Sequence, residues 1–471
     1  MAHVTSAPPA AVTGAPAGAV LALHGQSVDG VNRCVHCGLC LASCPTFAEL
    51  GTEMDSPRGR IFLIKSLAEG RIALTDSTVR HLDLCLGCRA CETVCPSGVP
   101  YGQLIEAARA EIERQRPGGR ARRIVRWVTF SLLLPHRRVL ALAAAGLRFY
   151  QSSGLQRLAR ASGLVKLLPA PLADWEPLLP TLPSARDRAP LPERTPAVGA
   201  RRATVGLLTG CVQQVAFGPQ NRATARVLAR NGAEVLAPRA QSCCGALHAH
   251  SGEHAMAQAL ARRAIEVFEG AGVEHVIVNT SGCGAHMKSY GMLLAGDPAW
   301  RDRAARFAAR VADISEFLAR EPLRGPLAEV RRTVTYHDPC HVVHGQKITK
   351  APRDLLAQIP GLRVVPLREA DWCCGSAGTY NLTQPEMAGR LQARKIANVE
   401  ATGADAVVTA NPGCIIQIAQ GLAARGSRIE VLHIVDLLDQ AYTGSLSPPA
   451  ALPNDRGLAD TSRPPGRPHV P

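Results

Sequence analysis

The sixteen cysteines of this chain form two internal repeats, and their placement constrains the fold more than any other feature. In the first repeat four cysteines recur 51 residues later: Cys34, Cys37, Cys40 and Cys44, then Cys85, Cys88, Cys91 and Cys95. In the second repeat four cysteines recur 129 to 131 residues later: Cys211, Cys243, Cys244 and Cys283, then Cys340, Cys373, Cys374 and Cys414. A chain of 471 residues needs no disulfides to hold its core together, so we interpret these thiols as metal ligands.

Each half of the first repeat has the spacing Cys-x2-Cys-x2-Cys-x3-Cys-Pro. Three cysteines this close together are typical of a [4Fe–4S] cluster. Structural zinc sites use two Cys-x2-Cys pairs separated by a longer loop, which makes zinc the weaker alternative. His36 lies between two of the cysteines and is a further candidate ligand, although a surface position is the commoner outcome for such a histidine. Downstream, Ser56 is the expected cap of a helix, and Arg58 and Arg60 are candidates to raise the potential of a nearby cluster.

The first repeat resembles the two-cluster ferredoxins of bacteria, in which the fourth cysteine of each run ligates the other cluster. The resemblance implies one [4Fe–4S] cluster on Cys34, Cys37, Cys40 and Cys95 and a second on Cys85, Cys88, Cys91 and Cys44. The spacing alone does not establish this exchange of ligands.

Each half of the second repeat follows a βαβαβ pattern. Strands are expected at Thr204–Thr209, Glu234–Ala237 and His275–Asn279, and again at Thr333–Tyr336, Leu362–Leu367 and Ala406–Thr409. Strands that alternate with helices predict parallel sheets. Every cysteine of this repeat falls just after a predicted strand, and ligands bind beyond the carboxyl ends of parallel strands. The four thiols of each half should therefore converge at one sheet edge.

The expected fold class is mixed α+β and α/β: an α-helical, ferredoxin-like two-cluster domain followed by two βαβαβ parallel-sheet modules. Each module carries the tripeptide Cys-Cys-Gly, so we call them CCG module 1 and CCG module 2. The expected segments are a disordered lead-in (1–30), the two-cluster domain (31–115), basic amphipathic helices with a Pro-rich linker (116–200), CCG module 1 (201–325), CCG module 2 (326–444) and a disordered tail (445–471).

Adjacent cysteines followed by glycine, in two copies behind an eight-cysteine segment, resemble the cysteine-rich family of heterodisulfide reductases and their relatives, which includes the iron–sulfur subunits of bacterial glycolate oxidases. The resemblance is carried by CVHCGLCLASCPTFAELGTEMDSPRGRI, CLGCRACETVCPSGVPYGQLIE, NTSGCGAHMKSYG, WCCGSAGTYNLTQPEMA and VTANPGC. It covers nearly all of residues 30–440 and is weak over 110–200.

The CCG modules depart from the heterodisulfide reductase pattern, in which each module ends in Cys-x2-Cys and supplies five cysteines. Here each supplies four, with His286 and Gln417 at the places of the missing ones. This departure puts a five-thiolate cluster in doubt. An ordinary iron–sulfur cluster, zinc and a metal-free module are the open alternatives for both cysteine sets of the second repeat.

Histidines near these cysteines are additional candidates. His286 can complete the site of CCG module 1. His337, His341 and His344 flank Cys340 and can tune a metal or carry protons. Hydrogen-bonded core or surface histidines are the commoner alternative.

Iron–sulfur clusters pass single electrons, whereas oxidation of a 2-hydroxy acid removes a hydride and needs a flavin or nicotinamide. The strand ends carry Thr-Gly-Cys, Ser-Gly-Cys and Pro-Gly-Cys in place of Gly-x-Gly-x-x-Gly, so we expect no flavin on this chain. The resemblance implies the electron-transferring, not the hydride-abstracting, subunit of a flavin-dependent glycolate oxidase. Such a subunit takes electrons from FAD-binding subunits that oxidise glycolate to glyoxylate and passes them to a quinone or other acceptor.

Two alternative functions fit the same pattern. One is the iron–sulfur subunit of a lactate or glycerol-3-phosphate dehydrogenase complex. The other is a heterodisulfide-reductase-like enzyme that acts on a disulfide at a CCG module.

The chain has 53 basic against 38 acidic residues, a formal charge of +15. Only 4% of residues are aromatic and no helix-turn-helix is recognisable, so we expect no nucleic-acid binding. Ten arginines between Arg109 and Arg148, interleaved with apolar stretches at 124–134 and 139–147, predict a basic amphipathic hairpin that can lie on an anionic membrane face. A solvated packing arm is the alternative. No apolar run is long enough to span a bilayer, so we expect a cytoplasmic protein with peripheral contact to the inner membrane face.

Overall fold

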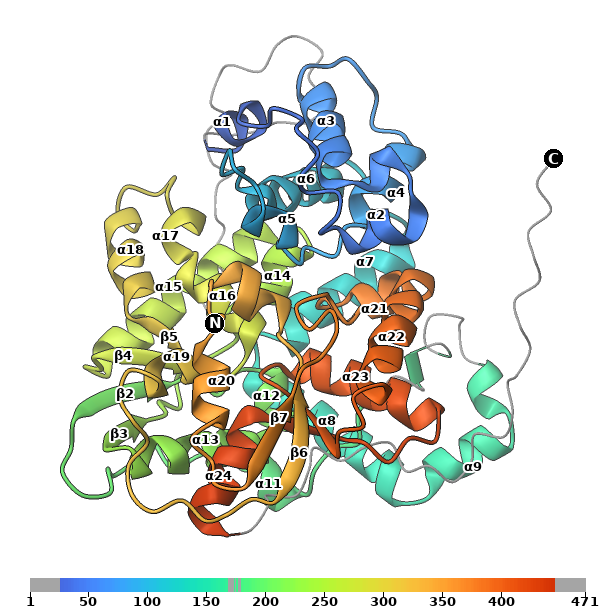
Figure 1. Ribbon diagram of the computed structural model, residues 1–471. Coiled ribbons are helices and arrows are strands. Elements are labelled where there is room, and N and C mark those ends of the chain that lie inside the picture. Colours follow the sequence, from blue (N-terminus) through green and yellow to red (C-terminus); the bar gives the residue numbers. More distant parts are fainter. Residues whose placement is uncertain (1–25, 168–172, 174, 177–178, 445–471) are drawn as a thin grey trace.

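Figure 1 presents the computed structural model, which describes residues 26–167, 173, 175–176 and 179–444. Most of the lead-in predicted at 1–30 and the whole tail predicted at 445–471 lie outside the described residues. The two-cluster domain lies above the two CCG modules in this view, and each module is built on its own sheet. The predicted class, a helical two-cluster domain with two parallel-sheet modules, is confirmed.

The two-cluster domain consists of helices joined by cysteine-bearing loops. Its helices are α1 (Gln26–Asn32), α2 (Pro45–Leu50), η1 (Glu53–Asp55), α3 (Pro57–Ala68), α4 (Asp76–Asp83), α5 (Ala90–Thr93) and α6 (Tyr101–Gln115). Helix α3 begins with Pro57, and the Ser56 hydroxyl accepts a hydrogen bond from the backbone N–H of Gly59 at 3.0 Å. This is the N-cap expected from the sequence.

A row of helices follows, before the first sheet. These are α7 (Arg120–Arg126), which continues into the π-helix η2 (Trp127–Leu133), then α8 (Arg137–Ser152), α9 (Leu155–Ala161), η3 (Leu164–Leu167) and α11 (Ala185–Arg188). Both helical stretches of the basic amphipathic pattern are therefore present. In the part of the chain that the structure describes, no single helix is both long and apolar enough to cross a membrane. The stretches 120–133 and 137–152 meet that criterion only together, across a bend of 112°.

CCG module 1 is a parallel sheet covered by helices. Its elements are β2 (Ala203–Leu207), α12 (Val212–Ala216), α13 (Gly218–Arg230), β3 (Ala233–Leu236), α14 (Ala246–His250), α15 (His254–Gly270), β4 (His275–Val278), α16 (Ser281–Lys288), α17 (Tyr290–Leu293), α18 (Arg301–Ala309), β5 (Val311–Asp313) and α19 (Ile314–Leu318). The edge strand β1 (Arg194–Thr195) pairs antiparallel with β3.

CCG module 2 repeats this plan. Its elements are β6 (Arg332–Tyr336), η5 (His341–Gly345), α20 (Ala351–Leu356), β7 (Leu362–Val365), α21 (Tyr380–Thr383), α22 (Pro385–Glu400), β8 (Ala406–Thr409), α23 (Pro412–Ala424), β9 (Glu430–His433) and α24 (Ile434–Thr443). The strand order is β3-β2-β4-β5 in module 1 and β7-β6-β8-β9 in module 2. In both, the first strand of the module lies between the second and the third.

This strand order creates the site for the cysteines. Val205 of β2 pairs with Val235 of β3 on one side and with His275 of β4 on the other. Chain connections leave β2 in opposite directions, so a crevice opens beyond its carboxyl end, as in other doubly wound sheets. The segments after β2, β3 and β4 all begin at this crevice, and they carry the four cysteines of the module, three in loops and Cys283 in the first turn of α16.

All six predicted strands are present, but each module has one strand more than the βαβαβ pattern predicts. The additional strands are β5, which has three residues, and β9, which has four. β5 is too short for a recognisable apolar run, whereas β9 is as long as β3 and lies beyond the last cysteine, where the predicted pattern ended. Each ends in a capping box: Asp313 caps α19 and His433 caps α24. The structure also places β1 within the span expected to be linker.

The two modules share one hydrophobic core. Leu207 and Val227 of module 1 belong to the same buried cluster as Val334, Leu355 and Val408 of module 2. The modules pack through α13 against α24 and α19 against α20, an approximately two-fold arrangement. They are therefore fixed relative to each other.

The glycine of each Cys-Cys-Gly tripeptide has a left-handed backbone, φ +90° at Gly375. A Cβ there would stand 2.6 Å from the carbonyl oxygen of Ala388. We expect Gly375→Ala to lower the free energy of unfolding by about 1–2 kcal/mol or more, measured by denaturant unfolding under anaerobic conditions. Gly389→Ala is the control, because Gly389 is helical and meets nothing within 4 Å. It should leave stability unchanged or raise it. Equal losses in both variants would contradict this account.

Candidate metal centres

The first candidate centre lies at the outer end of the two-cluster domain. Cys34, Cys37, Cys40 and Cys95 line a common pocket. The first three come from the loop between α1 and α2, and Cys95 follows α5. Cys91 also borders this pocket, and the Cys37 side is exposed to solvent. The cysteines that the two-cluster resemblance assigns to one cluster are thus brought together.

Left-handed backbone at matching positions shapes both cysteine loops. His36 and Gly87 each precede the second cysteine of a run, with φ of 54° and 64°. Gly38 and Arg89 each follow it, with φ of 85° and 64°. The His36 ring lies edge-on to Phe62, with ring centroids 6.4 Å apart. His36 therefore has a backbone and surface role in the structure.

The second candidate centre is buried. The remaining cysteines of the first repeat lie close enough to influence one another. Burial, followed by the neighbouring Cys88 and Cys85 thiols, raises the pKa of Cys91. Cys44 contributes to the same effect at Cys91 and at Cys88. The Tyr101 hydroxyl donates a hydrogen bond to Cys85 Sγ at 3.5 Å. Cys44 comes from the first run, as the exchange of ligands requires.

Arg60 lies beneath this second centre and is almost fully buried. Its guanidinium donates to the carbonyl oxygen of His81 at 2.7 Å and to Thr46 Oγ1 at 3.0 Å. It is 3.6 Å from the Asp55 carboxylate, which His81 also contacts at 2.8 Å. Burial opposes its charge, but Tyr101 and the thiols of Cys85 and Cys44 raise the pKa of Arg60. A permanent positive charge is thus held beside the thiols.

The second centre abuts CCG module 2. After burial, the largest influence that raises the pKa of Cys88 is the Cys340 thiol of the module. The Tyr380 hydroxyl donates a hydrogen bond to the Leu84 carbonyl oxygen at 2.9 Å. His341 Nε2 lies 3.0 Å from the carbonyl oxygen of Gly87. Sequence reasoning gave no indication of this contact, because it joins residues more than 250 positions apart.

The thiols of CCG module 1 gather at the predicted sheet edge. Cys211 precedes α12, and its Sγ lies 3.6 Å from that of Cys243. The backbone N–H of Gly245 donates to Cys243 Sγ at 3.4 Å. Cys283 lies in α16 and interacts with Cys244. The hydrogen bond with Cys243 lowers the pKa of Cys244, but the interaction with Cys283 and burial outweigh it, so the pKa is raised.

The thiols of CCG module 2 gather in the same way. Cys373 interacts with Cys340 and Cys374, and Cys374 interacts in turn with Cys414. Cys414 lies in the first turn of α23, where the Asn411 side chain donates to its Sγ at 3.4 Å. Hydrogen bonds to Cys373 and Cys414 lower the pKa of Cys374, and the nearby His337 imidazole contributes to the same shift.

A cavity of about 1200 Å³ connects these sites. It is lined by residues of the two-cluster domain, the helices after it and both modules. Cys85 and all eight cysteines of the second repeat line it: Cys211, Cys243, Cys244, Cys283, Cys340, Cys373, Cys374 and Cys414. The thiols of the two modules therefore face each other across one space.

Three histidines and one glutamate from different domains meet at the wall of this cavity. The rings of His250 and His341 have centroids 5.2 Å apart, and His250 Nδ1 lies 2.7 Å from Glu106 Oε1. Burial opposes ionisation of Glu106, but the hydrogen bond to His250 lowers its pKa to about 2. Burial lowers the pKa of His286 to about 3 and of His341 to about 4. Glu106 and His250 carried no sequence signal, since their pairing depends on how the domains dock.

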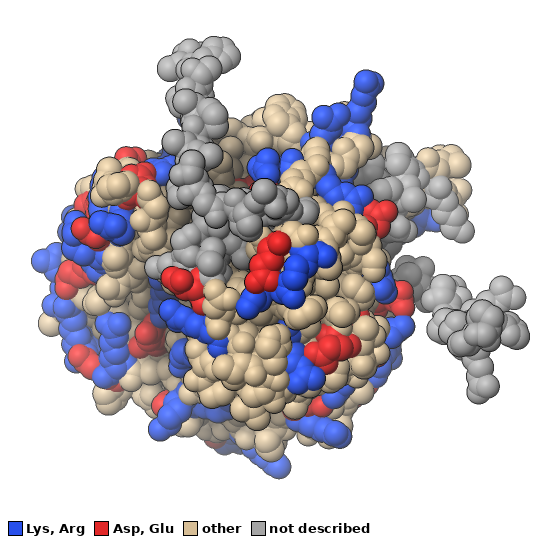
Figure 2. All heavy atoms as spheres, turned by 90° about the horizontal axis from the view of Figure 1, so that it is seen from above, with Lys and Arg blue, Asp and Glu red and all other residues tan. Residues whose placement is uncertain are grey.

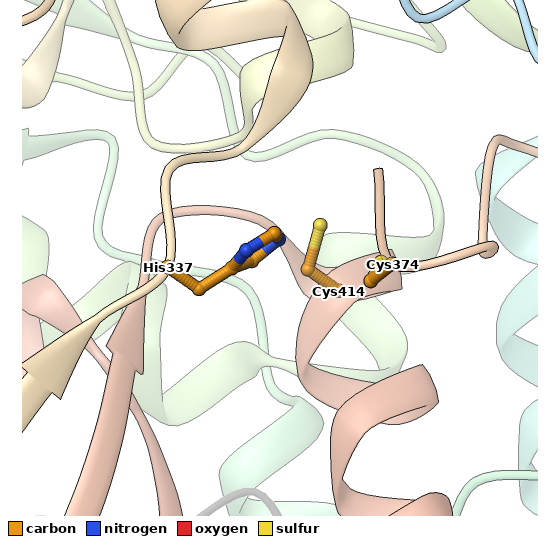
Figure 3. Close-up of side chains that lie close together, drawn as sticks. All are labelled: His337, Cys374 and Cys414. Atoms are coloured by element: carbon orange, nitrogen blue, oxygen red, sulfur yellow. The ribbon is translucent and has the colours of Figure 1, made fainter. Parts of the chain in front are cut away.

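The structure separates the candidate histidines. His286 packs on Tyr290, with ring centroids 5.4 Å apart. His344 lies 3.0 Å from the Thr93 hydroxyl and 3.1 Å from the Asp371 carbonyl oxygen. The Asn381 side-chain N–H donates a hydrogen bond to Gln417 Oε1 at 3.2 Å. Among the described residues, the one group of three metal-ligand atoms mutually within 4.8 Å is His337, Cys374 and Cys414, shown in Figure 3.

These sites suit soft metals. Clustered buried thiols are the preferred donors for iron–sulfur clusters and zinc. His337 Nε2 is buried without a hydrogen-bond partner, and a ring nitrogen of His337 lies within 4.8 Å of the Cys374 and Cys414 thiols, so it is available as a donor atom to a metal at this place. The donor set of the chain therefore fits iron–sulfur centres in the two-cluster domain and a Cys or Cys/His centre in each module.

The fold and these sites define an iron–sulfur protein with a two-cluster domain and two cysteine-rich modules. Residues 30–99 match the family "4Fe-4S dicluster domain", and residues 205–288 and 334–419 match "Cysteine-rich domain". Residues 121–179 match "Glycolate oxidase iron-sulfur subunit, linker region". The chain belongs to the family of glycolate oxidase iron–sulfur subunits.

Relatives support this membership along nearly the whole chain. The "Probable glycolate oxidase iron-sulfur subunit" of Bacillus subtilis (strain 168) is 41% identical, over 87% of this chain and 93% of its own. The "Glycolate oxidase iron-sulfur subunit" of Escherichia coli (strain K12) is 33% identical, over 89% and 96%. "Lactate utilization protein A" of Shouchella clausii (strain KSM-K16) is 33% identical over 50% of this chain and 98% of its own.

Arg60→Gln should lower the free energy of unfolding by about 3–5 kcal/mol, because it removes the buried cation that faces Asp55 and the thiols. Arg58→Gln is the matched control: Arg58 pairs with Glu53 at 2.7 Å in a solvent-exposed position. That variant should unfold at almost the wild-type denaturant concentration. Anaerobic denaturant titrations followed by circular dichroism compare the two, and similar losses would refute the role given to Arg60.

Proposed function

We propose that this chain is the electron-transferring subunit of a flavin-dependent glycolate oxidase. FAD-binding partner subunits oxidise glycolate to glyoxylate, and this chain accepts the electrons and delivers them to a quinone or another acceptor. Iron–sulfur clusters supply the one-electron chemistry for this role. The observation that carries the proposal is the shared cavity, where Cys85 and the eight module thiols meet, with Cys88 beside Cys340.

Specific ligand sets follow from the same geometry. We assign one [4Fe–4S] cluster to Cys34, Cys37, Cys40 and Cys95, and a second to Cys85, Cys88, Cys91 and Cys44. The common pocket of the first set and the mutual repulsion within the second support this exchange of the fourth cysteine. Left-handed residues on either side of Cys37 and Cys88 turn the loops around each set. The four cysteines of each CCG module are the proposed ligands of a further cluster or of zinc.

A second candidate function is electron transfer from lactate oxidation. It is favoured by the similarity to the Shouchella clausii protein named for lactate utilization, which extends over half of this chain. The substrate is oxidised by the partner subunits, so the residues of this chain do not select between the two 2-hydroxy acids.

Glycolate should reduce this chain only when the FAD-binding subunits are present. Mixed anaerobically with those subunits, the chain should lose visible absorbance and gain an EPR signal on addition of glycolate. The isolated chain with glycolate is the control and should stay oxidised. Lactate should reduce the complex about tenfold more slowly or worse, because it adds one methyl group to a site shaped for glycolate. Faster reduction by lactate would favour the second candidate, and no reduction by either acid would refute both.

We further propose that the helices after the two-cluster domain rest on the inner face of the cell membrane. Large apolar side chains are exposed on them: Ile124, Trp127, Leu142 and Phe149 are 59–74% exposed. Arginines such as Arg123 and Arg138 lie beside them, and they attract anionic headgroups. On the face seen in Figure 2, by contrast, basic side chains are scattered and acidic ones lie between them.

Leu142→Ser should weaken binding of the chain to vesicles that contain phosphatidylglycerol by about tenfold or more, since Leu142 would bury its side chain in the acyl boundary. Val198→Ser, at an exposed apolar residue outside these helices, is the matched control and should not change binding. Vesicle co-sedimentation measures both. Wild-type protein that stays in the supernatant, or equal effects of the two substitutions, would exclude this membrane contact.

A further inference from the structure

His337 follows β6 directly and is completely buried. Its Nδ1 lies 3.0 Å from the carbonyl oxygen of Ala370, which can only accept a hydrogen bond. The ring proton is therefore on Nδ1, and Nε2 is left with a free lone pair. In Figure 3 the ring points from the end of β6 toward Cys414 and Cys374. These two thiols and a ring nitrogen lie mutually within 4.8 Å.

An unpaired buried nitrogen is costly and calls for an explanation. His248, His250, His275 and His286 also have a buried ring nitrogen without a partner. Among the described residues, only His337 has a ring nitrogen that forms a group with two thiols, all mutually within 4.8 Å. His433, at the end of β9 in the same module, is hydrogen-bonded through both nitrogens. Its Nε2 lies 2.9 Å from the Asn279 carbonyl oxygen, and its Nδ1 accepts from Val435 N–H at 3.2 Å. His337 Nε2 has no such partner among the described residues. One nitrogen bonded to a backbone carbonyl and the other free toward thiols is the usual arrangement of a metal-ligating histidine.

The two modules differ at this position. His337 is three residues before Cys340, and the residue three before Cys211 in module 1 is Leu208. Leu208 is 2% exposed and packs in the apolar core of its module. CCG module 1 therefore offers four thiols at its strand ends, whereas CCG module 2 offers four thiols and one imidazole.

We propose that His337 Nε2 is a ligand of the metal centre in CCG module 2, together with Cys374 and Cys414, and that the two modules hold non-equivalent centres. This inference rests on the proposed function to the extent that the modules bind metal. The neutral imidazole adds no negative charge, and histidine ligation raises the potential of iron–sulfur centres relative to thiolate alone. The centre beside Cys88 would thus be the more oxidising of the two.

The donor spacing also bears on the kind of metal. Cys374, Cys414 and His337 are close enough to share a single ion, with Cys373 adjacent. Cys340 is outside this group and extends the set toward the two-cluster domain. A single zinc would use the compact group, and a polynuclear iron–sulfur cluster would use all five donors. In both cases His337 is a ligand.

The test uses the full chain, purified anaerobically with either natural or ¹⁵N-labelled histidine, after metal analysis. If the module metal is iron, pulsed EPR should detect a nitrogen coupling that changes with the ¹⁵N label. If it is zinc, X-ray absorption at the zinc edge should show imidazole scattering. Either signature should be lost in His337→Ala, partly return on addition of imidazole, and persist in His433→Ala, the matched buried histidine.

Because the first measurement is made on the wild-type chain, a variant that fails to fold does not block the test. Metal in the modules without a histidine signature would overturn the inference and leave the proposed function intact. A signature that survives in folded His337→Ala would also overturn it, since another histidine would be the ligand. Metal confined to the two-cluster domain would refute both this inference and the metal-binding role of the modules.

Discussion

Burial of closely spaced thiols is the constraint on which the rest of this structure depends. Parallel strands direct the module cysteines to one edge, and that edge is covered by the two-cluster domain. Burial and neighbouring thiols raise the pKa of Cys88, Cys91 and Cys244. Sulfur atoms packed in this way can carry negative charge only if a metal, a hydrogen bond or a nearby cation stabilises it. Each group of four cysteines must therefore be surrounded by compensating groups.

The structure supplies one cation near each group. Arg58 interacts with Cys37 and Cys40, and Arg60 with Cys44 and Cys85. In CCG module 1, burial lowers the pKa of Arg137 and the Cys211 thiol opposes that shift. In CCG module 2, burial lowers the pKa of Lys395, and Cys374, Cys373 and Cys414 oppose it. Arg58 pairs with Glu53 and Arg60 with Asp55. Arg137 and Lys395 are partly or fully buried, and because a buried cation is unfavourable without a counter-charge, thiolate groups are the best partners for these two side chains. The four cations come from three helices, α3, α8 and α22. Arg58 and Arg60 were candidates from the sequence, whereas no local motif indicates Arg137 or Lys395 as a partner of thiols.

The limit of sequence reasoning follows from the range of each interaction. The repeat offsets and the apolar runs at β2, β3, β4, β6, β7 and β8 are local, so the sheets and the sheet edge with the cysteines could be predicted. The strand β5 was missed because its three residues are too few to form a pattern, and β9 was missed because the predicted pattern of its module ended at the last cysteine. The docking of Cys88 against Cys340, the pairing of Glu106 with His250 and the burial of Arg60 depend on contacts between distant segments. His337 was recognised as a candidate, but its free nitrogen and its distance from two thiols are properties of the folded chain.

The asymmetry between the modules has a physical consequence for electron flow. Two copies of one site facing a common cavity would have equal potentials and would give electrons no direction. The copies differ in the side chains around the thiols: His337 stands where module 1 has Leu208. Counting from the alanine that touches each Cys-Cys-Gly glycine, Ala257 or Ala388, Lys395 stands where module 1 has Ala264. Each module has one cation near its thiols, Arg137 in module 1 and Lys395 in module 2. If both modules hold iron–sulfur centres, it is therefore the proposed neutral donor His337 that lowers the energy of an electron on module 2 relative to module 1.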